Sequence, residues 1–161
     1  VDIVTGTFGK ALGGAAGGFV ASSKPVVELL VQRSRPQLFS NALPAVVAGG
    51  AMAAVKLLKE QPQLVNKLHQ NVSFMRQGLK KLGYDILESP SAIIPVIVGD
   101  TAKAIAIAKK MLQQNIMITG FGYPVVPEGT ARLRAQISAA HSNEHLEKVL
   151  RTFETLKKDL D

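Results

Sequence analysis

The sequence predicts an α/β fold, and two observations support this prediction. In the second part of the chain, apolar runs of strand length alternate with segments whose apolar residues recur every three or four positions, as on one face of a helix. Apolar residues make up 47% of the 161 residues and aromatic ones only 5%, which describes a globular core of Val, Ile, Leu and Ala. Strands and helices that alternate in this way form a layer of sheet covered by helices, either α/β or α+β.

The first part of the chain is expected to contain short elements around a glycine-rich turn. Six glycines lie within residues 6–18, a density that indicates tight turns and close backbone contacts. Pro62 marks a break or a sharp kink between two predicted helices, so we place a domain boundary there and predict two domains, residues 1–61 and 62–161. The expected elements of the first domain are a buried strand within residues 1–10, a short strand at 18–21, a helix that Ser23 and Pro25 begin and Pro36 ends, and a helix from Pro44 through Leu58.

The second part of the chain is expected to contain three helices and three strands. Pro95 lies inside an apolar run and cannot donate to a ladder of hydrogen bonds, so its strand is expected at a sheet edge or at a bulge. The helices are expected to cover the strands of their own segment. The expected helices are 64–82, which Gly83 ends, 104–112, which Asp100 caps, and 146–156, and the expected strands are 93–98, 116–119 and 133–137.

Composition excludes several classes of protein. The chain has no cysteine, so a disulfide framework and a thiolate metal site are excluded, which fits a reducing compartment. No apolar run approaches the ~20 residues that span a bilayer, and nothing near Val1 has the layout of a signal peptide. We expect a soluble protein without a membrane partner, cytoplasmic or, in a eukaryote, mitochondrial. Because the chain opens with Val1 and starts at once with a strand, we also expect it to be a fragment.

The formal net charge of +7 raises the question of a nucleic-acid partner. The basic residues are scattered in pairs, such as Lys80 with Lys81 and Lys109 with Lys110, on separate predicted helices and without interleaved aromatic side chains. Such charges usually solubilise helices. We therefore expect no nucleic-acid partner, and a non-catalytic binding or structural module stays an alternative.

Lys10 stands alone within the glycine-rich turn, and two nucleotide-binding patterns fail there. A P-loop reads Gly-x-x-x-x-Gly-Lys followed by Ser or Thr, but the first and last of these positions hold Val4 and Ala11. Glycines at i, i+2 and i+5, the dinucleotide-binding pattern, occur nowhere in the cluster. The turn is therefore not predicted to bind a nucleotide in either of these ways.

Two interpretations of Lys10 stay open from the segment alone. One is a solvated lysine in a turn. The other is a lysine that forms a Schiff base with a planar cofactor, for which Gly9 and Gly13 would provide space and the hydroxyl of Thr7 a ligand for a phosphate.

No metal site is expected. His141 and His145 are four residues apart, but Ser142 stands where the zinc-protease pattern requires Glu. The pair therefore indicates the start of a helix.

Three motifs occur in order along the chain and together resemble one family. Residues 5–14 read TGTFGKALGG, residues 33–44 read RSRPQLFSNALP, and residues 123–141 read YPVVPEGTARLRAQISAAH. They resemble motifs of the α-oxoamine synthases, which are fold-type I pyridoxal-phosphate enzymes. The resemblance covers nearly the whole chain. It implies the C-terminal part of that fold, with a remnant of the large cofactor-binding domain in residues 1–61 and a small C-terminal α/β domain in residues 62–161.

The resemblance implies roles for five residues. Lys10 would bind pyridoxal 5'-phosphate covalently, and Thr7 would bind the cofactor's phosphate. Phe39 and Ser40 would reach the phosphate region of the neighbouring subunit's site, which requires a homodimer. Arg134 would bind the substrate carboxylate, a role that suits a guanidinium because it can pair with a carboxylate in a bidentate way.

The resemblance implies a reaction that joins an amino acid to an acyl-CoA. Residues 93–100 and 119–127 favour the glycine C-acetyltransferase subfamily, in which glycine and acetyl-CoA interconvert with 2-amino-3-ketobutyrate and CoA in threonine breakdown. The alternative within the family is an 8-amino-7-oxononanoate synthase or another α-oxoamine synthase, and an aminotransferase of the same fold is the alternative from another enzyme class. The acidic partner of the pyridine nitrogen and the aromatic residue stacked on the ring are expected before Val1, so we expect the chain alone to be inactive.

Overall fold

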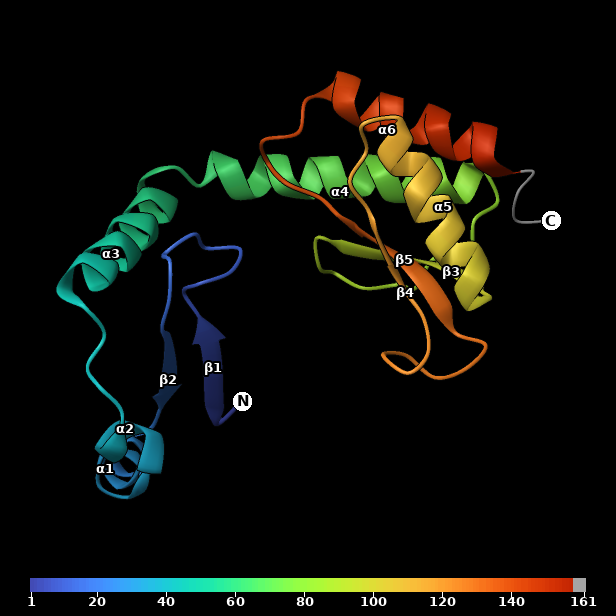
Figure 1. The fold of residues 1–161 in the computed structure, drawn as a ribbon. Helices are drawn as coiled ribbons and strands as arrows, with labels where there is room; N and C mark the ends of the chain where they lie inside the picture. The colour runs from blue at the N-terminus through green and yellow to red at the C-terminus, as the bar shows by residue number, and fades with distance from the viewer. Residues whose placement is uncertain (158–161) are drawn as a thin grey trace. The chain divides into compact units, whose positions relative to one another are not determined.

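The computed structural model describes residues 1–157, and the last four residues of the predicted second domain lie outside the described part. The described residues form two compact units, one spanning Val1–Pro62 and the other beginning at Gln63. Each unit has a sheet and helices of its own (Figure 1).

The first unit contains a two-stranded antiparallel sheet and three helices. A loop over residues 8–17 joins the strands at one end of the sheet, and the first two helices lie toward the other end (Figure 1). The predicted glycine-rich turn is therefore the connection of a hairpin. The strands are β1 (Ile3–Thr7) and β2 (Gly18–Ser22), and the helices are α1 (Lys24–Arg33), α2 (Arg35–Phe39) and α3 (Ala45–Glu60).

β1 lies where a strand was predicted, and within the described residues its apolar side chains are largely exposed. Ile3 is 52% and Val4 49% exposed. A ribbon of only two strands buries little of either face unless further layers of structure cover it. These two side chains belong to faces that the described part of the chain leaves largely uncovered.

The first helix ends before Pro36, as predicted, but a second short helix begins there. The backbone N–H of Ser34 donates to the Leu30 carbonyl at 2.8 Å and closes α1. α2 then starts at Arg35 with Pro36 in its first turn. Proline fits this position because the first turn of a helix uses no N–H donors and because its fixed φ is already helical. The same residue that cannot continue α1 therefore starts α2.

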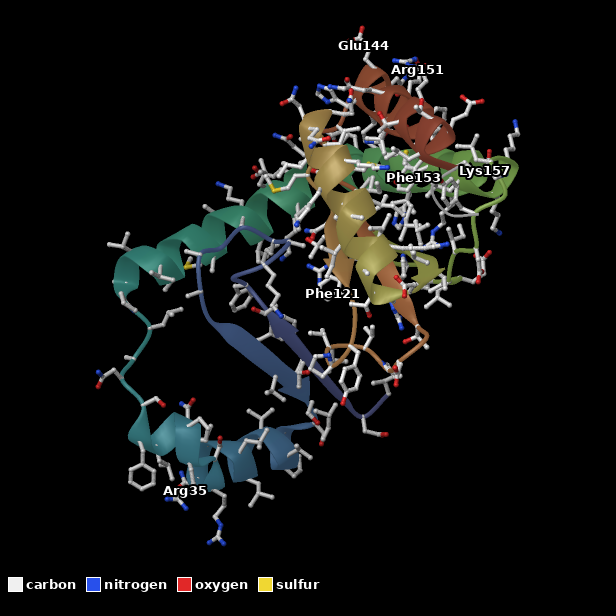
Figure 2. The ribbon with its side chains drawn as sticks, turned by 45° about the vertical axis from the view of Figure 1, so that its right-hand side comes forward. Arg35, Phe121, Glu144, Arg151, Phe153 and Lys157 are labelled. Atoms are coloured by element: carbon white, nitrogen blue, oxygen red, sulfur yellow. The ribbon has the colours of Figure 1, made fainter. Side chains whose placement is uncertain are left out.

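The second unit contains a three-stranded antiparallel sheet in the order β3-β5-β4 and three helices. Helix side chains pack on one face of this sheet, and Phe153 of α6 is fully buried among them while Glu144 and Arg151 point away from the sheet (Figure 2). The elements are α4 (Gln63–Lys81), β3 (Ile93–Gly99), α5 (Thr101–Gln113), β4 (Thr119–Phe121), β5 (Ala131–Gln136) and α6 (Asn143–Leu156). The fully buried core side chains include Met75, Leu79, Ile94, Val96, Met111, Leu133 and Phe153.

The residues that were predicted to begin or end helices in this unit do so in the structure. The carboxylate of Asp100 accepts a 2.7 Å hydrogen bond from the Lys103 N–H and caps α5. Gly83, with φ of +79°, ends α4 in the left-handed conformation that glycine adopts without strain. The helix predicted at 146–156 begins slightly earlier, where Ser142 and His145 form a capping box.

The strand predicted at 116–119 instead occupies Thr119–Phe121, and the reason is the end of α5. Asn115 has a left-handed φ of +59°, and the N–H of Ile116 donates back to the Met111 carbonyl at 3.0 Å. Helices commonly end this way, with an apolar residue just after the left-handed one packed against the helix. Ile116 is therefore buried as part of a helix end, which the sequence pattern could not distinguish from a strand.

Pro95 was expected at a sheet edge or at a bulge, and the structure places it at an edge. β3 is the outer strand of the three-stranded sheet, with a register shift between Ile97 and Gly99. Its outer edge is partly covered by the segment around Ile86, which forms an isolated bridge with Val96. Pro95 therefore lies where the sheet itself requires no donor from it.

Candidate functional site

The loop of residues 8–17 holds Lys10 and is closed by backbone hydrogen bonds. The N–H of Phe8 donates to the Gly17 carbonyl at 2.9 Å, and the N–H of Gly14 donates to the Phe8 carbonyl at 2.8 Å. The N–H of Gly13 donates to the carbonyl of Lys10 at 2.9 Å. The backbone on both sides of Lys10 is thereby held, while its side chain is exposed.

Two glycines in this loop are needed for space. A Cβ on Gly14 would lie 2.9 Å from the Cα of Ala51, so the loop packs directly on the backbone of α3. A Cβ on Gly9 would lie 2.8 Å from the carbonyl oxygen of Ala15, on the other side of the same loop. Neither contact could be relieved by turning a side chain, because backbone atoms form both. The glycine cluster therefore sets the shape of the loop that presents Lys10.

Thr7 lies at the end of β1, three residues before Lys10. Its hydroxyl donates to the Gly17 carbonyl at 3.2 Å and accepts from the N–H of Gly9 at 3.3 Å. The loop therefore offers an amine and a hydroxyl near one another in the sequence, on a rigid backbone. An amine can attack the carbonyl carbon of pyridoxal phosphate as a nucleophile, and the hydroxyl can donate to a phosphate if its one proton turns from the Gly17 carbonyl to the phosphate.

Phe39 and Ser40 lie at the end of α2, toward the opposite end of the first unit from the Lys10 loop (Figure 1). Both are exposed, and Phe39 is 79% exposed. No described contact joins either of them to Lys10. An aromatic side chain exposed to this degree is a candidate for contact with another part of the protein or with a second copy.

Arg134 lies in the second unit, on the face of the sheet that the helices leave open. Along β5, Ala131, Leu133 and Ala135 are buried on the helix side, and Arg134 points to the other side and is exposed. Its guanidinium carbon lies 5.1 Å from the centroid of the Phe121 ring, on the neighbouring strand β4. Lys10 and Arg134 thus belong to different units.

Asn71 is a structural residue of this unit that the sequence analysis did not single out. It is only 2% exposed, and its side-chain amide donates to the carbonyls of Ser138 at 2.9 Å and His141 at 3.0 Å. These bonds tie the turn after β5 to α4. A polar residue on the apolar side of a predicted helix, beside Val72, was the signal that could have identified it.

The two histidines stabilise the turn and the start of α6. Nδ1 of His141 accepts from the Ser138 N–H at 3.2 Å, and Nδ1 of His145 accepts from the Ser142 N–H at 3.3 Å. Burial lowers the pKa of His141 below its ordinary value, and the nearby His145 lowers it further. Among residues 1–157, no three His, Asp or Glu side chains are grouped so that they could hold a metal ion.

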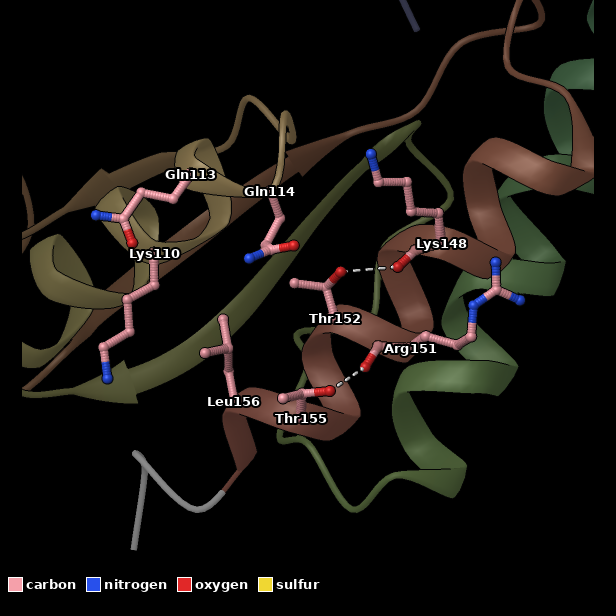
Figure 3. A pocket seen from close by; sticks show the side chains of 8 residues that line it. All are labelled: Lys110, Gln113, Gln114, Lys148, Arg151, Thr152, Thr155 and Leu156. Atoms are coloured by element: carbon pink, nitrogen blue, oxygen red, sulfur yellow. Dashed lines mark hydrogen bonds between the residues drawn. The ribbon is translucent and has the colours of Figure 1, made fainter.

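A groove of about 440 Å³ lies between the end of α5 and α6 (Figure 3). The hydroxyls of Thr152 and Thr155 donate to carbonyls of their own helix, at 2.9 Å and 3.0 Å, and Arg151 pairs with Glu147 at 3.5 Å. These groups are engaged within α6, and no predicted site residue contributes to the groove. Its lining residues are Lys110, Gln113, Gln114, Lys148, Arg151, Thr152, Thr155 and Leu156.

In the part of the chain that the structure describes, no helix is both long enough and apolar enough to cross a membrane.

Comparison with known proteins supports the fold and the resemblance. Residues 1–153 match the family model of class I and II aminotransferases. The chain is 42% identical over 160 residues to the 2-amino-3-ketobutyrate coenzyme A ligase of Escherichia coli strain K12, covering 99% of this chain and 40% of that protein. It is 38% identical to the 8-amino-7-oxononanoate synthase of Treponema denticola, covering 99% of this chain and again 40% of the relative.

Among solved structures, the serine palmitoyltransferase of Sphingomonas wittichii matches with a TM-score of 0.90 at 34% identity, over 99% of this chain and 40% of that one. The chain thus spans about 40% of the length of the relatives that it matches. The predicted fold class and the resemblance to the family are confirmed.

Proposed function

Because this chain belongs to the family of class I and II aminotransferases, we propose that it is part of a pyridoxal-phosphate-dependent acyltransferase. The reaction we propose interconverts glycine and acetyl-CoA with 2-amino-3-ketobutyrate and CoA. The observation that carries this proposal is the 42% identity, over nearly the whole chain, to a 2-amino-3-ketobutyrate coenzyme A ligase. The three ordered motifs found in the sequence support the same assignment.

Lys10 would hold the cofactor covalently through its amine, and the hydroxyl of Thr7 would bind the cofactor's phosphate. The hydrogen-bonded loop supports these roles, since it fixes the backbone at Lys10 and leaves the side chain accessible. When bound, the cofactor's pyridine ring accepts the electron pair that is left when a proton leaves the amino acid's Cα. The amine of Lys10, displaced by the amino acid, would then remove that proton as a base.

Arg134 would bind the carboxylate of glycine. Its exposure on the open face of the sheet supports this role, because the guanidinium is accessible to a ligand. Two parallel N–H donors of a guanidinium match the two oxygens of a carboxylate, which fixes both the position and the orientation of a small amino acid.

We further propose a homodimer in which Phe39 and Ser40 of one subunit contribute to the phosphate region of the other subunit's site. The 79% exposure of Phe39 supports a contact beyond the described part of this subunit. A cytoplasmic location, or a mitochondrial one in a eukaryote, goes with the proposal.

The second candidate within the family is an 8-amino-7-oxononanoate synthase, which the 38% identity to that enzyme of Treponema denticola favours. An aminotransferase of the same fold is the candidate that would use Lys10 without an acyl-CoA. A non-catalytic module would use neither Lys10 as a catalytic residue nor an acyl-CoA as a substrate.

The deciding experiment measures free thiol when the complete protein is incubated with pyridoxal phosphate, glycine and acetyl-CoA. We expect glycine-dependent release of CoA, and none from Lys10→Ala. Borohydride reduction and peptide mapping should place a pyridoxyl group on Lys10, with Lys24→Ala as the variant that keeps the label. A protein that carries the label but releases no thiol would support the aminotransferase or a synthase with another acyl donor, and a label on a different lysine would refute the role of Lys10.

A further inference from the structure

We infer that Phe121 is a positioning residue for Arg134, which holds the guanidinium in place without occupying its hydrogen-bond donors. This inference rests on the proposed function, because it concerns how Arg134 is prepared to bind the carboxylate of the amino-acid substrate.

The sheet register places the two side chains on the same open face. In the order β3-β5-β4, Arg134 lies directly between Pro95 and Thr119, and Phe121 is the next residue of β4 on that face. Diagonal neighbours of this kind are within reach of long and aromatic side chains. The guanidinium carbon of Arg134 accordingly lies 5.1 Å from the centroid of the Phe121 ring, which is a cation–π distance.

No acidic side chain neutralises Arg134 in the described part of the chain. Pro95 and Thr119, its direct neighbours across the sheet, carry no charge. Among residues 1–157 the guanidinium of Arg134 has neither a hydrogen bond nor an ion pair, and the contact described for it is the one with the ring of Phe121.

Arg132 gives an internal comparison on the same strand and face. Its Nε donates to the Thr130 carbonyl at 3.0 Å, and its Nη2 donates to the Thr130 hydroxyl at 3.2 Å. Arg132 is the register partner of Phe121, yet it folds back onto Thr130, and the ring lies against Arg134. Arg132 therefore uses N–H donors in hydrogen bonds to Thr130, whereas Arg134 lies against the face of an aromatic ring.

This difference suits the binding of a carboxylate. The guanidinium carbon of Arg134 lies over the face of the Phe121 ring, and within residues 1–157 none of its N–H donors is used on an oxygen, so these donors are available for a bidentate pair with a carboxylate. An arginine that is already oriented loses less rotamer freedom when the ligand binds. The ring should therefore strengthen ligand binding without competing for the same donors.

The position of Phe121 is itself well determined by packing. A Cβ on Gly120 would lie 2.9 Å from the Ala104 carbonyl, so β4 approaches the backbone of α5 closely at that point. Just after the strand, the Tyr123 N–H donates to the Thr101 hydroxyl at 3.3 Å. β4 is thus held against α5 on both sides of Phe121, and the ring projects to the opposite, open face.

The test compares Phe121→Leu, Phe121→Met and Phe121→Tyr in the complete enzyme loaded with pyridoxal phosphate. Glycine binding is measured by titration calorimetry, and the KM for glycine and kcat are measured by thiol release. Leu and Met keep apolar bulk but lack the aromatic face, so each should weaken glycine binding and raise KM by about fivefold, with kcat within about twofold of the wild type. Tyr keeps the ring and should restore wild-type affinity. Phe74→Leu, which removes a half-exposed ring from α4, is the matched control and should change neither value.

A merely structural role would lower stability in all three variants and would not distinguish Tyr from Leu and Met. The inference is overturned if Leu and Met leave glycine affinity unchanged, or if Tyr weakens it as much as they do. Failure of the proposed function looks different, because the wild-type enzyme would then release no CoA with glycine.

Discussion

The guanidinium of Arg76 donates a 3.0 Å hydrogen bond to the carbonyl oxygen of Leu87. The N–H of Leu87 donates to the Pro95 carbonyl at 3.1 Å, so these two residues form a hydrogen-bonded pair at the outer edge of β3. In an antiparallel pair the return bond would come from the N–H of residue 95, which proline lacks. Arg76 of α4 supplies that missing donor from the side and also donates to the Ile93 carbonyl at 3.2 Å.

We predict that Arg76→Met destabilises the chain by about 1–3 kcal/mol, because it leaves backbone carbonyls at the edge of β3 without their donor. The measurement is urea unfolding of the 161-residue chain followed by circular dichroism. Lys81→Met is the control, since it also removes a positive charge from α4 but at an exposed position. Equal destabilisation by both changes would show that charge, rather than the bonds at the sheet edge, was responsible.

A comparable loss of stability is expected for Asn71→Ala. The change removes the two donors that hold the Ser138 and His141 carbonyls and leaves a space in the core, so unfolding should become easier by about 1–3 kcal/mol. Asn66→Ala, at an exposed position of the same helix, should alter the free energy of unfolding by less than about 0.5 kcal/mol. Faster hydrogen exchange in the turn of residues 138–141 would locate the effect, and unchanged exchange there would contradict it.

Two glycines of the first unit should respond to alanine in opposite directions. Gly14→Ala places a Cβ 2.9 Å from the Ala51 backbone and should destabilise the loop by about 1–3 kcal/mol. Gly49→Ala adds a Cβ within α3 with nothing inside 4 Å, and should stabilise the chain by about 0.5–1 kcal/mol. Urea unfolding measures both. Because the Gly14 loop carries Lys10, the complete enzyme should also bind pyridoxal phosphate more weakly with Gly14→Ala, and unaltered binding would show that the loop tolerates the shift.

Arg134→Lys should weaken glycine binding by about 10- to 100-fold, since a lysine keeps the charge but loses the bidentate pair, which is worth about 1.5–3 kcal/mol. Cofactor absorbance should not change. Arg132→Lys is the control, because the donors of Arg132 are directed to Thr130. Titration of the complete enzyme with glycine measures the effect. Similar losses of glycine affinity in both variants would contradict the assignment of carboxylate binding to Arg134 rather than to Arg132.

Local sequence patterns were sufficient to predict most of the helices and strands. The apolar spacing of residues 64–82 predicted α4, and Gly83 and Asp100 marked a helix end and a helix start for local steric and hydrogen-bonding reasons. The prediction of an edge position for Pro95 required only that proline lacks an N–H. The motif around Lys10 pointed to a family, and the similarity of the whole chain to its relatives supports that assignment.

Only the tertiary structure decided which distant residues meet. Asn71 bonds to residues 67 and 70 positions away, and the ring of Phe121 meets Arg134 because β4 and β5 pair in one particular register. Patterns along the chain report which side of a helix or strand is apolar, but a register one residue different would turn every side chain of β4 to the other face. Ile116 shows the same limit, because an apolar residue is buried equally well by a strand and by a helix end, and the fold of the chain around Asn115 selects the helix end.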